Sequence, residues 1–380
     1  MQKEFHYDAA FLAAVIAGYT HEEAVTIACS DQFVDDCTKT LLRKLQAPVS
    51  AATTQSMAEL AEIRPNILAL QDITRIWASF HFLPFDLAAD PHRGGRAYKN
   101  KYRLICNSNG PLVEETVKLA RGKGLQAAGL AMHVLCDTWA HKYFAGTPSL
   151  VINNVNYYFR EILEDQTERE ISFHHTVAAQ DDVFEGRYHC SLYQNAENSV
   201  MNLGHGRAGH FPDYSFARYK YLPAWGDYAE VIKDNPSDYL YAFAQMVQAL
   251  RFLKGDAADF GPAEYAWAEI APYREKIEKI LCTRQADAEA DWKQLGEKVS
   301  GRRIPAYDAE IWQREYLAAG EAEKENTFLG RFILAALAQK SMVTQKIYES
   351  GNLLAGISIN YHEKGFGGIR DYAQLIRHMR

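Results

Sequence analysis

The spacing of apolar and polar positions predicts a chain built from helices. Apolar residues recur at helical intervals over 5–19, 21–46 and 111–145, and again in several stretches from 236 to the end. Long runs rich in Ala, Leu, Glu and Lys favour helix, and there are only 12 prolines. We therefore predict an all-α fold, a multi-helix bundle with a site in a cleft between helices.

Several local signals divide this pattern. Thr20 and Glu23 form a capping box, which predicts that a helix begins between them. Glycine and asparagine turn signals predict loops over 87–110 and 202–225. We expect residues 1–230 to form a helical metal-binding core and residues 231–380 a helical C-terminal region packed on it. One continuous domain is the alternative.

The most informative stretch runs from Gly124 to Gly146 and is apolar on almost every side. It carries His133, Asp137 and His141, which are spaced four apart and so share one face of a helix. A buried carboxylate is unfavourable by several kcal/mol unless it is paired or bound to a cation. Imidazole and carboxylate groups suit zinc or another first-row metal. We favour a metal over the alternative, a polar seam whose members satisfy one another.

Three other segments carry candidate ligands. Asp31 and Asp35 lie on the core-facing line of the 21–46 helix, with Asp36 one step around it. A solvated acidic turn explains these three equally well. His81 lies between two phenylalanines, where a core histidine is the simpler interpretation. The last segment is a glycine-rich loop that can bend to bring its side chains together or can simply be exposed, and it contains His205, His210 and Asp213.

Composition excludes several classes of protein. Hydrophobic residues make up 48% of the 380 positions, and the net charge of −7 argues against nucleic-acid binding through a basic surface. Six cysteines without a CxxC pair suggest reduced, mostly buried thiols and a cytoplasmic protein. The apolar segment 9–19 is too short to cross a bilayer, and a positively charged leader does not precede it. There is no Walker, GxSxG or HExxH motif, and no GxGxxG motif that follows a predicted strand.

The phrase LQAAGLAMHVLCDTWAH resembles the central helix of the zinc-dependent phospholipases C, the single-strand-specific zinc nucleases and the glycosylphosphatidylinositol phospholipases D. In those enzymes a helix of small residues leads into His-x-x-x-Asp, matched here by His133 and Asp137. His141 matches a further histidine of the phospholipase D branch. The order FH, SDQFVDD, FHFLP and MHVLCDTWAH also resembles an uncharacterised bacterial family. The resemblance spans about residues 5–225.

This resemblance implies a metal centre and a reaction. His6, Asp35 or Asp36, and His81 correspond to further ligands, and Asp137 corresponds to the carboxylate that bridges two metals. The secreted relatives also use a freed N-terminal amine as a ligand, and Met1 lies only five residues before His6, so we do not expect that ligand here. Their third metal takes a His-x-x-x-Glu pair, which this chain lacks, so His205 and His210 would have to replace it. We therefore expect one or two zinc ions.

The function that we predict is hydrolysis of a phosphoester by a zinc-activated water. Asp36 or Asp213 is the candidate general base, and Arg218 is a candidate for binding a phosphate oxygen. The substrate class stays open between a lipid, a nucleotide and a small phosphoester. One rival is a non-enzymatic helical protein with a structural metal or a degenerate site used for binding. The other is a helical scaffold without a metal.

Overall fold

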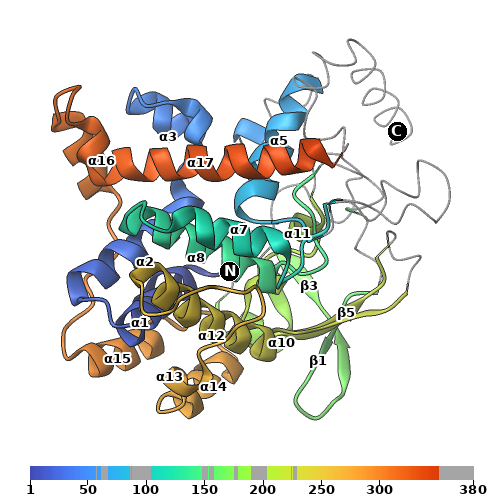
Figure 1. Cartoon of the computed structure of the whole chain (residues 1–380). Helices are drawn as coiled ribbons and strands as arrows, with labels where there is room; N and C mark the ends of the chain where they lie inside the picture. The colour runs from blue at the N-terminus through green and yellow to red at the C-terminus, as the bar shows by residue number, and fades with distance from the viewer. Residues whose placement is uncertain are drawn as a thin grey trace.

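Helix α8 (Leu125–Ala140) lies at the centre of the molecule (Figure 1). The computed structural model describes residues 1–56, 58–60, 67–85, 87, 104–147, 153, 158–174, 179–189, 203–223, 225 and 229–350. Every residue of α8 after Leu125 is buried, as expected of a helix that is apolar on nearly every side. Among the described helices, it packs most extensively against α2 (His21–Asp36), α7 (Pro111–Ala120), α12 (Asn235–Lys254) and α17 (Phe328–Glu349), and it also contacts α5 (Ile67–Phe80).

The helical segments that the sequence predicts are present but shorter. The first consists of a π-helical turn, η1 (Phe5–Ala9), followed by α1 (Ala10–Ile16). The second divides into α2 and α3 (Lys39–Lys44), because Thr38 caps a new helix after α2 ends. The remaining helices are η2 (Val49–Ala51), α5 (Ile67–Phe80), α10 (Gln180–Glu185), α11 (Gly204–Arg207), η3 (Phe211–Asp213), α13 (Trp267–Ile270), α14 (Arg274–Cys282), α15 (Glu289–Ser300), α16 (Glu310–Ala318) and η5 (Lys324–Asn326).

Two details of the prediction are confirmed. The Thr20 amide donates to the Glu23 carboxylate at 2.8 Å and the Glu23 amide donates to the Thr20 hydroxyl at 3.3 Å, which is the capping box at the start of α2. The five described cysteines are free thiols, and all but Cys282 are buried. Most of the predicted loop over 87–110, and residues 351–380, lie outside the described residues.

The all-α prediction is wrong, because two small sheets accompany the helices. Strands β1 (Arg160–Ile162), β2 (Glu168–Glu170), β5 (Arg218–Tyr221) and β6 (Val231–Asp234) form an antiparallel sheet in the order β2-β1-β5-β6. Strands β3 (Ser172–His174) and β4 (Arg187–His189) pair in parallel. Strands of three or four residues are too short for a clear two-residue period, so composition and helical spacing hid them.

The larger sheet is continuous with the helical core. β5 follows the segment that carries Asp213, and β6 leads directly into α12. The inner side chains of β5, Tyr219 and Tyr221, are fully buried. One cluster of buried side chains includes residues from both sides of residue 230. Among the described helices, none combines the length and the apolar character that a bilayer crossing requires.

Gly129 allows α2 and α8 to approach closely. A Cβ atom at this position would lie 2.2 Å from the Ile27 carbonyl oxygen and 2.9 Å from the Asp31 amide nitrogen, both of which are backbone atoms of α2. Ser30 also donates a hydrogen bond of 2.7 Å to the Gln126 carbonyl. Because Gly129 has no side chain, the backbone of α2 comes close to α8 at this position.

We expect Gly129→Ala to destabilise the protein strongly, because the backbone of α2 would have to move away from α8. Overpacking of a core contact is unfavourable by about 1–3 kcal/mol, and a clash with backbone belongs at the upper end of that range. Thermal unfolding measures the effect. Gly320→Ala is the matched control, because a Cβ atom there meets nothing within 4 Å. Equal melting temperatures for the two variants would contradict the close approach.

Asp8, on η1, is a buried carboxylate with no partner of its own. It is fully buried, and neither oxygen has a hydrogen-bond partner among the described residues. Burial raises the pKa of Asp8 from 3.8 to about 7, although nearby Lys293 opposes the shift. Because the folded-state pKa lies above the unfolded one, ionisation of Asp8 weakens the fold as the pH rises from about 4 to 7.

We expect Asp8→Asn to be more stable than the wild type at pH 8, by up to about 4 kcal/mol for a shift of about three pKa units. The advantage should shrink as the pH falls towards 4, because the buried carboxyl is then protonated and the same carboxyl in the unfolded chain is taking up its proton. Denaturant unfolding between pH 4 and 8 measures it. The control is Asp72→Asn, which removes a part-exposed charge beside Lys39 and should change stability by less than about 1 kcal/mol.

Candidate metal centre

The polar face of α8 forms as the sequence predicts. His133 and Asp137 lie one turn apart within the helix, and His141 caps its end. His133 Nε2 lies 3.2 Å and His141 Nδ1 3.5 Å from Asp137 Oδ2, so the three side chains converge. His133 and Asp137 are at most 1% exposed. A carboxylate therefore sits deep in the core with an imidazole on either side.

Other elements bring more nitrogens to Asp137. From the end of α5, His81 Nδ1 lies 3.1 Å from Asp137 Oδ2. From η1, His6 Nε2 lies 3.2 Å from the other oxygen, Oδ1. The α-amino group of Met1 donates to Oδ1 at 2.8 Å, so the structure places at the centre the amine that we did not expect there. Each oxygen of Asp137 thus has its own set of nitrogens.

The set on Oδ2 has the geometry of a metal site. His81 Nδ1, His133 Nε2 and Asp137 Oδ2 are 3.1–3.2 Å from one another. Four ligands at 2.0–2.1 Å around a tetrahedral zinc lie roughly 3.3 Å apart, which is close to this spacing. Asp35 Oδ1 lies 3.8 Å from both rings and supplies a fourth donor. The Asp35 side chain is 35% exposed, so this corner of the group is open.

A further set of donors gathers around Asp213. His141 Nε2 and His205 Nε2 each lie 3.1 Å from Asp213 Oδ1, and His210 Nδ1 lies 3.1 Å from Oδ2. His205 comes from the short helix α11, and Asp213 ends η3. The first turns of α12 hold this segment in place. The Asn235 side chain donates to the backbone carbonyls of Pro212 and Tyr214, and the Tyr239 hydroxyl donates to the backbone carbonyl of Asp213.

Backbone carbonyls fix the orientation of two of the rings. His81 Nε2 lies 3.0 Å from the Thr53 carbonyl, which leaves Nδ1 facing Asp137. His141 Nδ1 lies 2.7 Å from the His81 carbonyl, which leaves Nε2 facing Asp213. A neutral imidazole has one N–H group. Each of these rings donates that N–H to a backbone carbonyl, so its other nitrogen directs a lone pair towards the carboxylates. Metal-binding histidines are usually oriented in this way.

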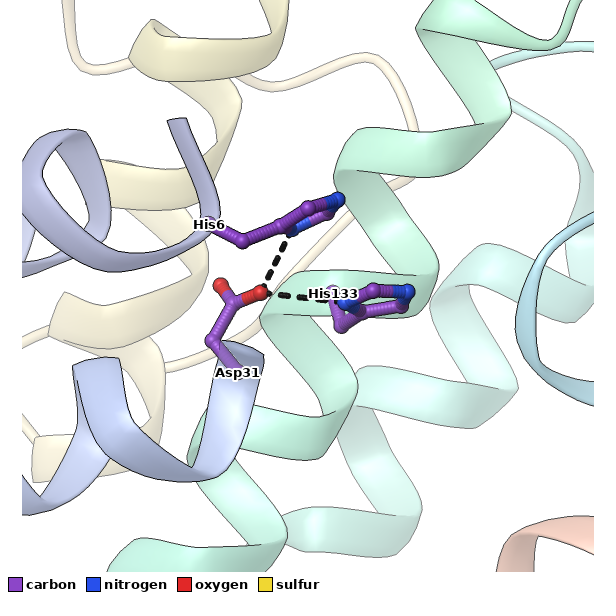
Figure 2. A group of neighbouring side chains, drawn as sticks. All are labelled: His6, Asp31 and His133. Atoms are coloured by element: carbon purple, nitrogen blue, oxygen red, sulfur yellow. Dashed lines mark hydrogen bonds and ion pairs between the residues drawn. The ribbon is translucent and has the colours of Figure 1, made fainter. Parts of the chain in front are cut away.

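Asp31 is part of the centre, although the sequence identified it only as a neighbour of Asp35. Its Oδ1 atom lies 2.6 Å from His6 Nδ1 and 3.3 Å from His133 Nδ1, and the three side chains come from η1, α2 and α8 (Figure 2). Asp31 and Asp35 are four residues apart and so share a face of α2. That spacing was the signal that could have placed both at the site.

Three groups of described residues have ligand atoms close enough to hold a metal ion. They are His6 with Asp31 and His133, Asp35 with His81 and His133, and His141 with His205 and Asp213. The sequence-predicted ligands His6, Asp35, His81, His133, Asp137, His141, His205, His210 and Asp213 therefore lie in one connected cluster.

A protein-family model matches residues 1–347 of the chain, a range that includes the whole cluster. It describes a family of unknown function, DUF6765. The chain belongs to this family. Searches among the curated proteins and among the solved structures give no match.

Two predicted residues of this DUF6765 protein lie apart from the cluster. Asp36 accepts a hydrogen bond of 2.5 Å from the Tyr307 hydroxyl, and burial raises its pKa. Arg218, on β5, pairs with Asp234 at 3.1 Å. The choice between Asp35 and Asp36, which the sequence left open, is therefore made by the direction in which α2 presents each side chain: Asp35 is the one near the histidines.

The electrostatics of the cluster favour a cation. Burial alone would raise the pKa of Asp137, but His141, the amino group of Met1 and His133 hold it well below its ordinary value. Burial likewise lowers the pKa of His133, yet Asp137 and Asp35 raise it to about 10. The structure thus places carboxylates so densely that an imidazole between them favours the charged form.

The donor set fits a divalent metal. Four carboxylates, Asp31, Asp35, Asp137 and Asp213, meet imidazoles and one ammonium group, and among the described residues no Lys or Arg pairs with them. His6 Nε2 is buried, 3.2 Å from Asp137 Oδ1, and without a hydrogen-bond partner among the described residues. A lone pair facing a carboxylate in the core is unfavourable unless a proton or a metal ion lies between them.

We expect Asp35→Asn to weaken binding of zinc to the metal-stripped protein, because its carboxylate lies beside His81 and His133. Asp36→Asn, one residue further along the same helix, should bind zinc as the wild type does, because its carboxylate bonds to Tyr307. Isothermal titration with zinc compares the two. A larger loss for Asp36→Asn than for Asp35→Asn would show that the assignment is reversed.

Proposed function

We propose that the protein is a metal-dependent phosphoester hydrolase, with zinc or another first-row divalent metal bound around Asp137. The observation that carries the proposal is the placing of separate nitrogen donors on the two oxygens of this one carboxylate. Such a carboxylate can bridge two ions, and the group around Asp213 is a third candidate set. In two-metal hydrolases the ions act together on the attacking and leaving oxygens.

The order of the ligands along the chain supports the same proposal. His6, Asp35, His81, His133 and Asp137 follow one another as in the zinc-dependent phospholipases C and nucleases that the sequence resembles, and His141 matches the further histidine of the phospholipase D branch. The Met1 amine, at 2.8 Å from Asp137, occupies a place that those enzymes give to an N-terminal amine. Buried free thiols agree with the cytoplasmic setting that we propose.

Zinc at such a centre supplies a hydroxide nucleophile at neutral pH and offsets negative charge on phosphoryl oxygens. His81, His133, Asp35 and Asp137 would hold one ion, and His6, the Met1 amine and Asp137 a second. Asp35 and His210 have side chains 35% and 40% exposed, the most open of the cluster, so a substrate can reach the centre beside them.

The exposed carboxylate is the better candidate for the general base. Asp213, predicted from the sequence, has both oxygens occupied by histidines, and Asp36 is bonded to Tyr307. Asp35 has only the two rings 3.8 Å away and is open to solvent. Asp35 would bind the ion through Oδ1, which faces the two rings, so we assign the removal of a proton from the attacking water to its other oxygen and the protonation of the leaving group to His210.

The test is hydrolysis by the zinc-loaded full chain of three substrates: bis(p-nitrophenyl) phosphate, phosphatidylcholine vesicles and a single-stranded oligonucleotide. The substrate that is hydrolysed identifies the class. Asp137→Asn should reduce kcat/KM by more than about a hundredfold, since outer-shell partners alone account for 10–100-fold. Asp72→Asn is the control and should hydrolyse as the wild type does.

Two results would contradict the proposal. Tightly bound zinc with no turnover of any substrate would indicate a structural metal, an alternative favoured by the complete burial of His6 and His133. A metal-free protein with full thermal stability that gains none from added zinc would rule out the metal as well.

A further inference from the structure

Asp31 is best understood from the two rings that it contacts. The His6 and His133 rings stack with centroids 3.9 Å apart and planes 19° apart. Their Nδ1 atoms face Asp31 Oδ1 on one edge, and their Nε2 atoms face Asp137 on the other. Two nearly parallel imidazoles are thus held between two buried carboxylates, Asp31 and Asp137, and Figure 2 shows the Asp31 side of this arrangement.

The short contact shows which carboxylate is the ligand. His6 Nδ1 and Asp31 Oδ1 are 2.6 Å apart, well inside the roughly 3.3 Å that separates two ligands of one tetrahedral zinc. This is a hydrogen bond, in which Nδ1–H donates to the carboxylate. On the Asp137 side both Nε2 distances are 3.2 Å, as expected for ligands that share an ion. A metal therefore fits between the rings and Asp137, and Asp31 lies behind them.

We infer that Asp31 is a positioning residue that fixes His6 and His133 together, so that one carboxylate prepares two metal sites. It accepts Nδ1–H from His6 at 2.6 Å and lies 3.3 Å from Nδ1 of His133, and with Nδ1 directed to Asp31 each ring is left with Nε2 facing Asp137. His6 belongs to the set on Asp137 Oδ1 and His133 to the set on Oδ2. The inference rests on the proposed metal centre. It adds to that centre a residue that keeps the donors on Asp137 Oδ1 and those on Oδ2 in fixed positions relative to each other.

The surroundings of Asp31 support this role over a structural one. Asp31 is fully buried, and its second oxygen has no hydrogen-bond partner among the described residues. Among the described residues, its charge faces only the two imidazoles, and a buried charge paired so sparsely destabilises the fold in the absence of metal. A metal on Nε2 polarises each ring and strengthens its Nδ1–H bond to Asp31. Asp31 should therefore weaken the metal-free protein and stabilise the metal-bound one.

The test compares wild type with Asp31→Asn in binding of zinc to the metal-stripped full chain. We expect an unchanged number of ions by native mass spectrometry, with affinity reduced 10–100-fold at two ions rather than at one. The metal-free melting temperature should stay the same or rise, because a buried charge is removed. Asp31→Glu, which retains the charge, should recover part of the affinity. Asp72→Asn should match the wild type.

A spectroscopic measurement checks the tautomers. In the zinc-loaded wild type, proton–nitrogen spectra of the histidine rings should show Nδ1–H for His6 and His133, with slow solvent exchange. Asp31→Asn should speed that exchange at both rings. A structural role for Asp31 would change neither ring's exchange while the zinc stays bound.

Several outcomes would overturn the inference. Loss of one bound ion would make Asp31 a ligand, while wild-type affinity, or failure of the Asn variant to fold without metal, would make it structural. A wild type that binds no metal would overturn the inference and the proposed function together. A wild type that binds zinc but hydrolyses no phosphoester would contradict the proposed function alone.

Discussion

The structure depends on the burial of Asp137 inside α8. A carboxylate at most 1% exposed can stay ionised only if positive charge surrounds it, and here imidazoles and an ammonium group approach both of its oxygens. Removing these charged groups from water is unfavourable by several kcal/mol unless each charge has its partners. The Met1 amine, His6 from η1 and His81 from the end of α5 meet His133 and His141 of α8 around this carboxylate, and a bound cation would complete the set.

The approach of α2 to α8 makes this arrangement possible. Without a side chain at Gly129, the two backbones lie close enough for α2 to place Asp31 behind the rings and Asp35 beside them. The Asp213 segment depends in the same way on α12, through Asn235 and Tyr239. Packing therefore determines the chemistry, since a shift of either helix would separate donors that now lie 3.1–3.8 Å apart.

Parts of this could be predicted from the sequence, because they depend on local spacing. The i, i+4 spacing of His133, Asp137 and His141 determines one face of a helix, and the capping box determines where α2 begins. Asp31 was noted on the core-facing line of α2 but left out of the predicted metal ligands, and Asp35 could not be separated from Asp36, because their roles depend on the helix that packs against α2. The strands were missed because RYKY at 218–221 is too short to distinguish from irregular chain.

The most direct test of the central claim is a crystal of the full chain measured at the zinc absorption edge after zinc has been added. The account predicts anomalous peaks on both sides of Asp137, one near His81 and His133 and one near His6. A map with no peak, in which the histidines bond directly to the Asp137 oxygens, would show that the buried carboxylate is satisfied by protein groups alone and would contradict the account.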